Sequence, residues 1–193
     1  MDIMLNIVDI PIAPIAAVGD RETQANRLYN KAYLLLEDDI DYANLPDETI
    51  SSAARTMAAL NLKENATGFV EVSFVKHTAG HTSEGSEGDI TSEVTNTISG
   101  TLGGRRTVID NLIESNLGKS FLLVTIDVVT GKKYIHGRPY APLTLSSFSK
   151  RVNGENCSCD VTFTQKNLMQ ELEYLGSVTP AAAAAEEEGD GNS

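Results

Sequence analysis

The chain has 193 residues, of which 41% are hydrophobic and 22% charged, and its formal net charge is −12. This length and composition allow one folded domain with a real core plus arms or tails, and they exclude a wholly disordered chain. No apolar run approaches the roughly 20 residues that cross a bilayer, and the start of the chain lacks the basic residues of a secretory signal, so we expect neither a membrane span nor export by that route.

The charges are unevenly distributed along the sequence. Residues 1–99 carry 6 basic residues (Lys/Arg) and 16 acidic ones (Asp/Glu). Residues 100–166 carry 9 basic and 5 acidic residues, and residues 167–193 carry 6 acidic residues and no basic ones. Nucleic-acid binding depends on neutralising phosphates, so an acidic chain with one basic third is poorly suited to it. The distribution suits contacts between copies of the chain, in which unlike patches meet, and ordinary solubility explains it equally well.

The first 65 residues differ in character from the rest. Pro11 and Pro14 keep the start extended, and the seven Ile, Leu and Val residues of Met1–Ala17 are too many for a free tail. We expect this segment to lie on a neighbouring subunit, with a first strand in the chain's own sheet as the alternative. Leu28–Leu36 fits either a strand or a helix, whereas Thr49–Leu60 has helical spacing.

The segment from Phe69 to Thr164 is predicted to be mostly β. Phe69–Val75 is rich in aromatic and β-branched residues, as strands are. The polar stretch Lys76–Asp89, punctuated by glycines, has nothing to bury and is predicted to be a long exposed loop. A second strand follows, because Ile90, Val94 and Ile98 share its even positions.

Beyond Gly103 the apolar period changes to that of a helix. The apolar residues of Val108–Leu117 recur at helical spacing, and Gly118 stands where a C-cap glycine belongs. The nearly continuous apolar strand Phe121–Val129 then turns at Thr130-Gly131-Lys132 into Tyr134–His136, which predicts a hairpin.

The last predicted strands flank a turn at Asn153-Gly154. Leu143, Leu145 and Phe148 begin one strand, and the apolar residues of Cys157–Phe163 occupy alternate positions of the next. The folded part is expected to end near Val178, because the Ala and Glu runs that follow have no apolar face to bury.

These elements predict a mainly β (α+β) fold. It is an antiparallel β-sandwich or barrel with one packed helix, plus an N-terminal extension and a disordered acidic C-terminal tail. The expected division is an N-terminal arm or helical extension at residues 1–65, a β-sandwich domain at residues 66–178 and a flexible acidic tail at residues 179–193.

No group of residues forms a catalytic constellation. His77 and His81 are four residues apart, but Gly80 lies between them in a polar stretch, which favours a solvated loop over metal binding. Cys157 and Cys159 would share one face of a strand and are predicted to be core residues without a metal or redox function. We therefore expect no catalytic, cofactor-binding or metal-binding residues, and no enzyme activity.

Four segments carry a resemblance to a known family: Gly68–Phe74, the strand Ile90–Ser99, the hairpin Phe121–Ile135 and the stretch Tyr134–Leu143. Their order, with the predicted helix between the second and third, resembles the tail tube proteins of tailed bacteriophages and their relatives in contractile injection systems. The composition is also similar to that of proteins of crAss-like phages, whose short tails are built from stacked rings.

The resemblance implies a virion structural protein, assembled in the host cytoplasm, whose copies form a ring in a phage tail or head–tail channel. It implies contacts with adjacent ring, tail or portal-side proteins, and passage of DNA without sequence-specific binding. No cofactor and no membrane partner are expected. Two alternatives stay open: a small-ligand-binding β-sandwich or barrel, and an enzyme whose site is split between subunits.

Overall fold

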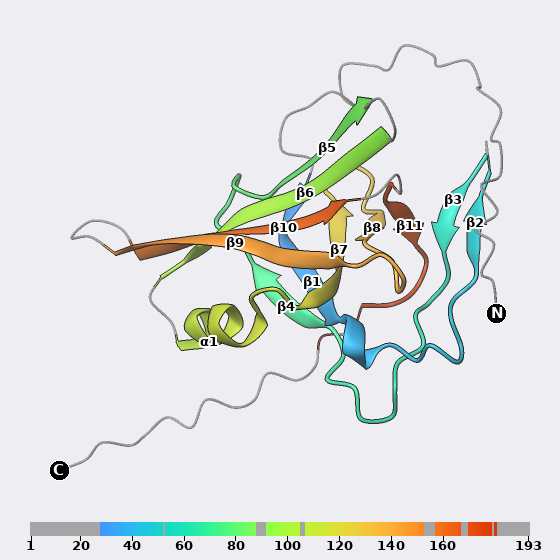
Figure 1. Ribbon diagram of the computed structural model, residues 1–193, viewed down its shortest axis with the longest axis horizontal. Coiled ribbons are helices and arrows are strands. Elements are labelled where there is room, and N and C mark those ends of the chain that lie inside the picture. Colours follow the sequence, from blue (N-terminus) through green and yellow to red (C-terminus); the bar gives the residue numbers. More distant parts are fainter. Residues whose placement is uncertain are drawn as a thin grey trace.

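The computed structural model describes residues 28–51, 53–87, 92–104, 107–152, 157–166, 170–178 and 180. In this part of the chain eleven strands form one mixed sheet, and α1 (Thr107–Asn116) is the single α-helix (Figure 1). This architecture confirms the predicted mainly β fold with one packed helix. The predictions for Met1–Ala17, for the Asn153-Gly154 turn and for the tail beyond Pro180 fall outside the described residues.

The strands vary from three to twelve residues in length. They are β1 (Leu28–Leu36), β2 (Glu48–Ile50), β3 (Arg55–Met57), β4 (Val70–Ser73), β5 (Gly80–Glu87), β6 (Ser92–Gly103), β7 (Ser120–Asp127), β8 (Lys133–His136), β9 (Leu143–Val152), β10 (Cys157–Lys166) and β11 (Leu172–Tyr174). A short 3-10 helix, Glu37–Asp39, follows β1.

The sheet divides into two layers at β7. Its main path runs β2-β3-β11-β8-β7-β9-β10-β6-β5, and β1 joins β7 to β4 at the side. Because β1 pairs with one edge of β7 over most of its length, β8 and β9 must share the other edge: β8 takes Leu123–Ile126 and β9 only Ser120 and Phe121. The β9-β10-β6-β5 part thus leaves the plane of the rest and makes the second layer.

The central position of β7 explains its nearly continuous apolar sequence. Phe121 and Leu123 point into one core cluster, together with residues of β9, β10 and α1, whereas Leu122 and Val124 point into a second cluster with residues of β3, β8 and β11. A strand buried on both faces needs apolar side chains at consecutive positions rather than at alternate ones.

Helix α1 covers the first of these clusters. Ile109 and Ile113, one turn apart, are buried in it, and Leu112 packs against its margin. The helix ends as predicted: Gly118 has a φ of +80°, the left-handed conformation that glycine adopts without a steric penalty.

The predicted helix over Thr49–Leu60 is wrong. The segment contains β2 and β3, which form a hairpin around Ser51, whose hydroxyl accepts hydrogen bonds from the amides of Ala53 and Ala54. Met57 is fully buried in the second core cluster, and β3 pairs in parallel with β11. This distant pairing outweighs the local helical spacing, as tertiary context often does.

The predicted loop over Lys76–Asp89 is also wrong in its larger part. Gly80–Glu87 is strand β5, which pairs with β6 along its whole length. The sequence of β5 is typical of a loop because the strand lies at the end of the sheet and the side chains of Thr82–Ser86 are exposed. Hydrogen bonds to β6, rather than burial of side chains, hold the strand in place.

Strands β1, β2 and β3 come from the segment that the sequence assigned to an N-terminal extension. They belong to the same sheet as the following strands, and Leu34 and Leu35 of β1 lie in the two core clusters. In the described residues, therefore, the positions from 28 onward contribute directly to the sandwich.

Candidate functional site

Three side chains that can bind metals meet where the two layers come together. His81 comes from β5, His136 from the end of β8, and Glu171 directly precedes β11. The two imidazole rings pack edge to face with their centroids 4.6 Å apart, and one nitrogen or oxygen atom from each of the three residues lies within 4.8 Å of the others. We call these residues the His–His–Glu cluster.

Neighbouring polar groups hold the cluster in place. The Oγ1 atom of Thr125, on β7, lies 2.8 Å from Nε2 of His136 in a buried hydrogen bond. The Ser83 hydroxyl donates to Oε1 of Gln170 at 3.0 Å, so β5 is attached to the segment before β11 beside the cluster. His81 Nε2 is buried and has no hydrogen-bond partner among the described residues.

The buried imidazole of His136 is held in its neutral form. Desolvation by burial, with a smaller contribution from the nearby His81, lowers the pKa of His136 from 6.5 to about 3. A neutral imidazole keeps a lone pair for hydrogen bonding or for a metal ion.

The lowered pKa of His136 predicts a loss of stability in acid. The unfolded chain binds a proton at this ring near pH 6.5, whereas the folded chain does so only near pH 3. The free energy of unfolding is therefore expected to fall by about 1.4 kcal/mol per pH unit as the pH drops between these two pKa values. Above pH 6.5 the full stabilisation from the neutral His136 ring is present.

Urea unfolding of the chelator-treated protein at several pH values measures this slope. His81 and Glu171 lie beside the same ring, so His136→Gln, which changes only that ring, is the matched comparison. The stability difference between wild type and variant should shrink toward pH 3. Parallel pH profiles of the two proteins would contradict the prediction.

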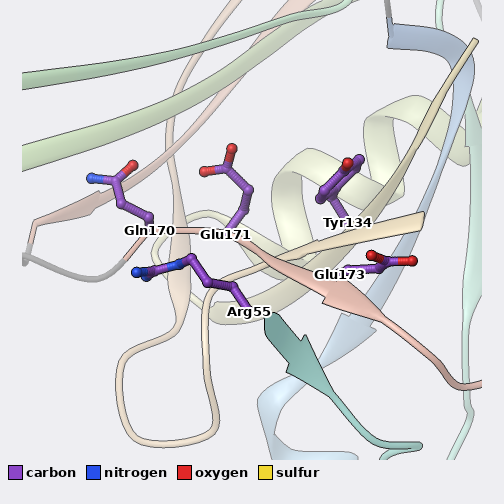
Figure 2. Close-up of a pocket in the computed structure, with 5 residues that line it drawn as sticks. All are labelled: Arg55, Tyr134, Gln170, Glu171 and Glu173. Carbon is purple, nitrogen blue, oxygen red and sulfur yellow. The ribbon is translucent and has the colours of Figure 1, made fainter. Parts of the chain in front are cut away.

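A shallow groove of about 410 Å³ opens beside the cluster. It is lined by Arg55, Tyr134, Gln170, Glu171 and Glu173, and Figure 2 shows Arg55 on β3 below Gln170 and Glu171. Glu171 thus belongs to both the groove and the His–His–Glu cluster. One guanidinium and two carboxylates line the groove, so it carries charges of both signs.

A second polar group lies in the loop between β8 and β9, within residues Tyr134–Leu143. Gly137 begins the loop with a φ of +81°, and the backbone groups of Arg138 and Ala141 form two reciprocal hydrogen bonds. The Arg138 side chain is 5% exposed, and its Nη1 atom lies 2.9 Å from Oε2 of Glu48 on β2. This ion pair fastens the β2–β3 hairpin to the loop.

The structure also presents surfaces suited to contacts between copies. The strands β2 and β5 end the described sheet path, and β4 pairs only with β1, so each has an open edge in this part of the chain. The β9–β10 hairpin extends beyond α1 (Figure 1), and the outer half of β9 is exposed. Phe148 and Val152 on this half are 43% and 57% exposed.

The cysteines and the remaining histidine lie away from the His–His–Glu cluster. Cys159 is buried and Cys157 is half-buried, so the core position predicted for both is found only for Cys159. Burial and the neighbouring Asp160 raise the pKa of the Cys159 thiol, which therefore stays protonated at neutral pH. His77 is exposed and has a φ of 64° in the turn before β5.

Sequence reasoning missed the cluster because its signal is not local. The i,i+4 spacing of His77 and His81 drew attention to the wrong pair, since the true neighbour of His81 is on β8. The three residues come together only in the folded chain, in which β5 lies against β8 and β8 pairs with β11.

No α-helix in the described ranges has the length and apolar character needed to cross a membrane. A comparison of the chain with protein-family models and with curated proteins found no match.

Proposed function

We propose that the protein is a virion structural protein whose copies assemble into a ring that forms part of a bacteriophage tail or head–tail channel. The observation that carries this proposal is the combination of open sheet edges with a projecting β9–β10 hairpin that exposes apolar side chains. An open edge can accept a strand from a second copy, which supplies backbone hydrogen bonds and side-chain contacts together.

The polar character of the β5 edge supports controlled assembly. Thr82–Ser86 is exposed and includes Glu84, and charged or polar residues on an edge strand discourage unspecific pairing. Such an edge pairs well only where the partner supplies matching groups. The ring is therefore expected to depend on the apolar hairpin for affinity and on the edge for register.

The charge distribution supports passage of DNA without tight binding. The net charge of −12 works against phosphate contacts, and the basic third of the chain includes Lys150 and Arg151 on the hairpin. Arg151 pairs with Asp160 at 3.4 Å but is 69% exposed, so on this proposal it also faces an acidic surface of the neighbouring copy. On this proposal the protein acts in the virion after assembly in the host cytoplasm, next to other ring, tail or portal-side proteins.

The test is the oligomeric state of the full chain. We expect size-exclusion chromatography with light scattering to show discrete oligomers, and electron micrographs to show rings. The double variant Phe148→Ser/Val152→Ser should weaken association at least tenfold. The matched control Val128→Ser/Val129→Ser removes two valines that are 56% and 49% exposed in the β7–β8 turn, and it should leave association unchanged.

Two results would overturn the proposal. One is a monomer at all concentrations, including in the presence of virion proteins that can nucleate assembly. The other is an oligomer that loses the same affinity in both double variants, because the β9–β10 hairpin would then have no particular role.

The alternative is a small-ligand-binding β-sandwich, and an apolar pocket favours it. A pocket of about 310 Å³ lies between α1 and strands β1 and β4, with Leu34, Leu36, Val70, Leu112 and Phe121 among its lining residues. Ligand sites are concave and mostly apolar. A monomer that takes up an apolar fluorophore, and loses it in a Leu112→Gln variant, would favour this function over assembly.

A further inference from the structure

We propose that His81, His136 and Glu171 form a binding site for Zn²⁺ that joins β5 to the opposite part of the sheet. This inference does not depend on ring assembly. Two imidazole nitrogens and one carboxylate oxygen are ligand types that Zn²⁺ uses, and two histidines with one glutamate provide the three protein ligands of an open zinc site.

The distances fit a site that closes around the ion. Zn–N bonds of about 2.0–2.1 Å place the ligand atoms of a tetrahedron about 3.3 Å apart. The candidate ligand atoms are within 4.8 Å of one another, so the site needs a contraction of about 1.5 Å at most. Glu171 is only partly buried, and its long side chain can supply most of this movement.

The state of the two histidines is an independent argument for a ligand. His81 Nε2 is buried without a hydrogen-bond partner among the described residues, which is costly unless something else binds there. His136 is buried and fixed through Thr125 Oγ1, as the outer-shell partners of metal-binding histidines commonly fix those rings.

The position of the site gives Zn²⁺ a structural effect. His81 lies on β5, the last strand of the sheet path. His136 lies on β8 and Glu171 just before β11, and both of these strands belong to the other half of the path. An ion bound to all three would close the sandwich across this junction. It would stabilise the folded chain, because the three ligands are not brought together in the unfolded state.

Titration of the chelator-treated full chain with Zn²⁺ tests the proposal, with calorimetry for stoichiometry and thermal unfolding for stability. We expect one Zn²⁺ per chain, a higher Tm in its presence, and no comparable effect of Mg²⁺, which prefers oxygen ligands. Bound Co²⁺ should show d–d bands in the visible spectrum without the thiolate charge-transfer band that Cys157 or Cys159 would produce.

Variants identify the ligands. His81→Ala and Glu171→Gln change partly buried side chains, so both should fold, and each should weaken Zn²⁺ binding at least tenfold. The control His77→Asn removes the third histidine of the chain, and asparagine tolerates the positive φ of that position. It should leave binding unchanged.

Three results would overturn the proposal. The first is that the chain does not bind Zn²⁺ stoichiometrically. The second is that Zn²⁺ still binds equally well in both His81→Ala and Glu171→Gln. The third is that His77→Asn weakens Zn²⁺ binding as strongly as His81→Ala does.

Discussion

The Glu48→Ala variant is expected to lose about 3–5 kcal/mol of unfolding free energy, which is a large part of the stability of a domain of this size. Glu48 is the carboxylate partner of the buried guanidinium of Arg138, and the two side chains are 16% and 5% exposed. Removing Glu48 leaves a buried positive charge without compensation, and it releases the β2–β3 hairpin from the loop after β8. Urea unfolding, extrapolated to zero denaturant, measures the loss.

An exposed ion pair and a double variant serve as controls. Lys132 and Glu173 lie 2.7 Å apart, but their side chains are 49% and 28% exposed, so Lys132→Ala should cost less than about 1 kcal/mol. Glu48→Leu/Arg138→Met removes both charges and should recover most of the stability lost in Glu48→Ala. Equal losses in Glu48→Ala and Lys132→Ala would contradict the prediction.

The Phe163→Ala variant is expected to lose about 3–5 kcal/mol as well, for a different reason. Phe163 is 1% exposed, and its ring packs edge to face on Phe121 with centroids 5.9 Å apart. Since Phe163 is on β10 and Phe121 on β7, this pair joins the two layers of the sandwich. Truncation removes apolar surface from the first core cluster and leaves a cavity between the layers.

Phe148→Ala provides the matched control on the adjoining strand. Phe148, on β9, lies opposite Val161 of β10 but is 43% exposed. Its truncation to alanine should therefore lower the unfolding free energy by less than about 1 kcal/mol, measured at protein concentrations where the chain is monomeric. If the two phenylalanine variants had equal unfolding free energies, the assignment of Phe163 to the centre of the core would be wrong.

The sequence predicted those elements whose side-chain pattern directly reflects burial. Strand β7 reads as an apolar run because both of its faces are covered, α1 reads as a helix because one stripe packs on the core, and β10 alternates because it has one buried face. In each case the local period and the tertiary environment agree.

The elements that were missed depend on partners far away in the sequence. The β2–β3 hairpin is stabilised by β11 and by Arg138, neither of which leaves a trace in the spacing of Thr49–Leu60. Strand β5 is an edge strand whose outer half is exposed, so its polar composition carries no strand pattern. For the same reason His81 looked like a loop residue, and its neighbours His136 and Glu171 were not recognised.

The parallel pairing of β3 with β11 has a consequence for how the chain folds. Residues 56–57 pair with residues 173–174, and in the described sheet the β2–β3 hairpin connects to the other strands only through β11. During synthesis the β2–β3 hairpin leaves the ribosome early, and the free edge of β3 has no partner until β11 follows after almost all of the remaining strands. Closing so long a loop is slow, because its entropy cost comes before the contacts that repay it. The last step of folding is therefore expected to be the docking of this hairpin, and the waiting chain is the stage most open to wrong pairing with a neighbouring copy.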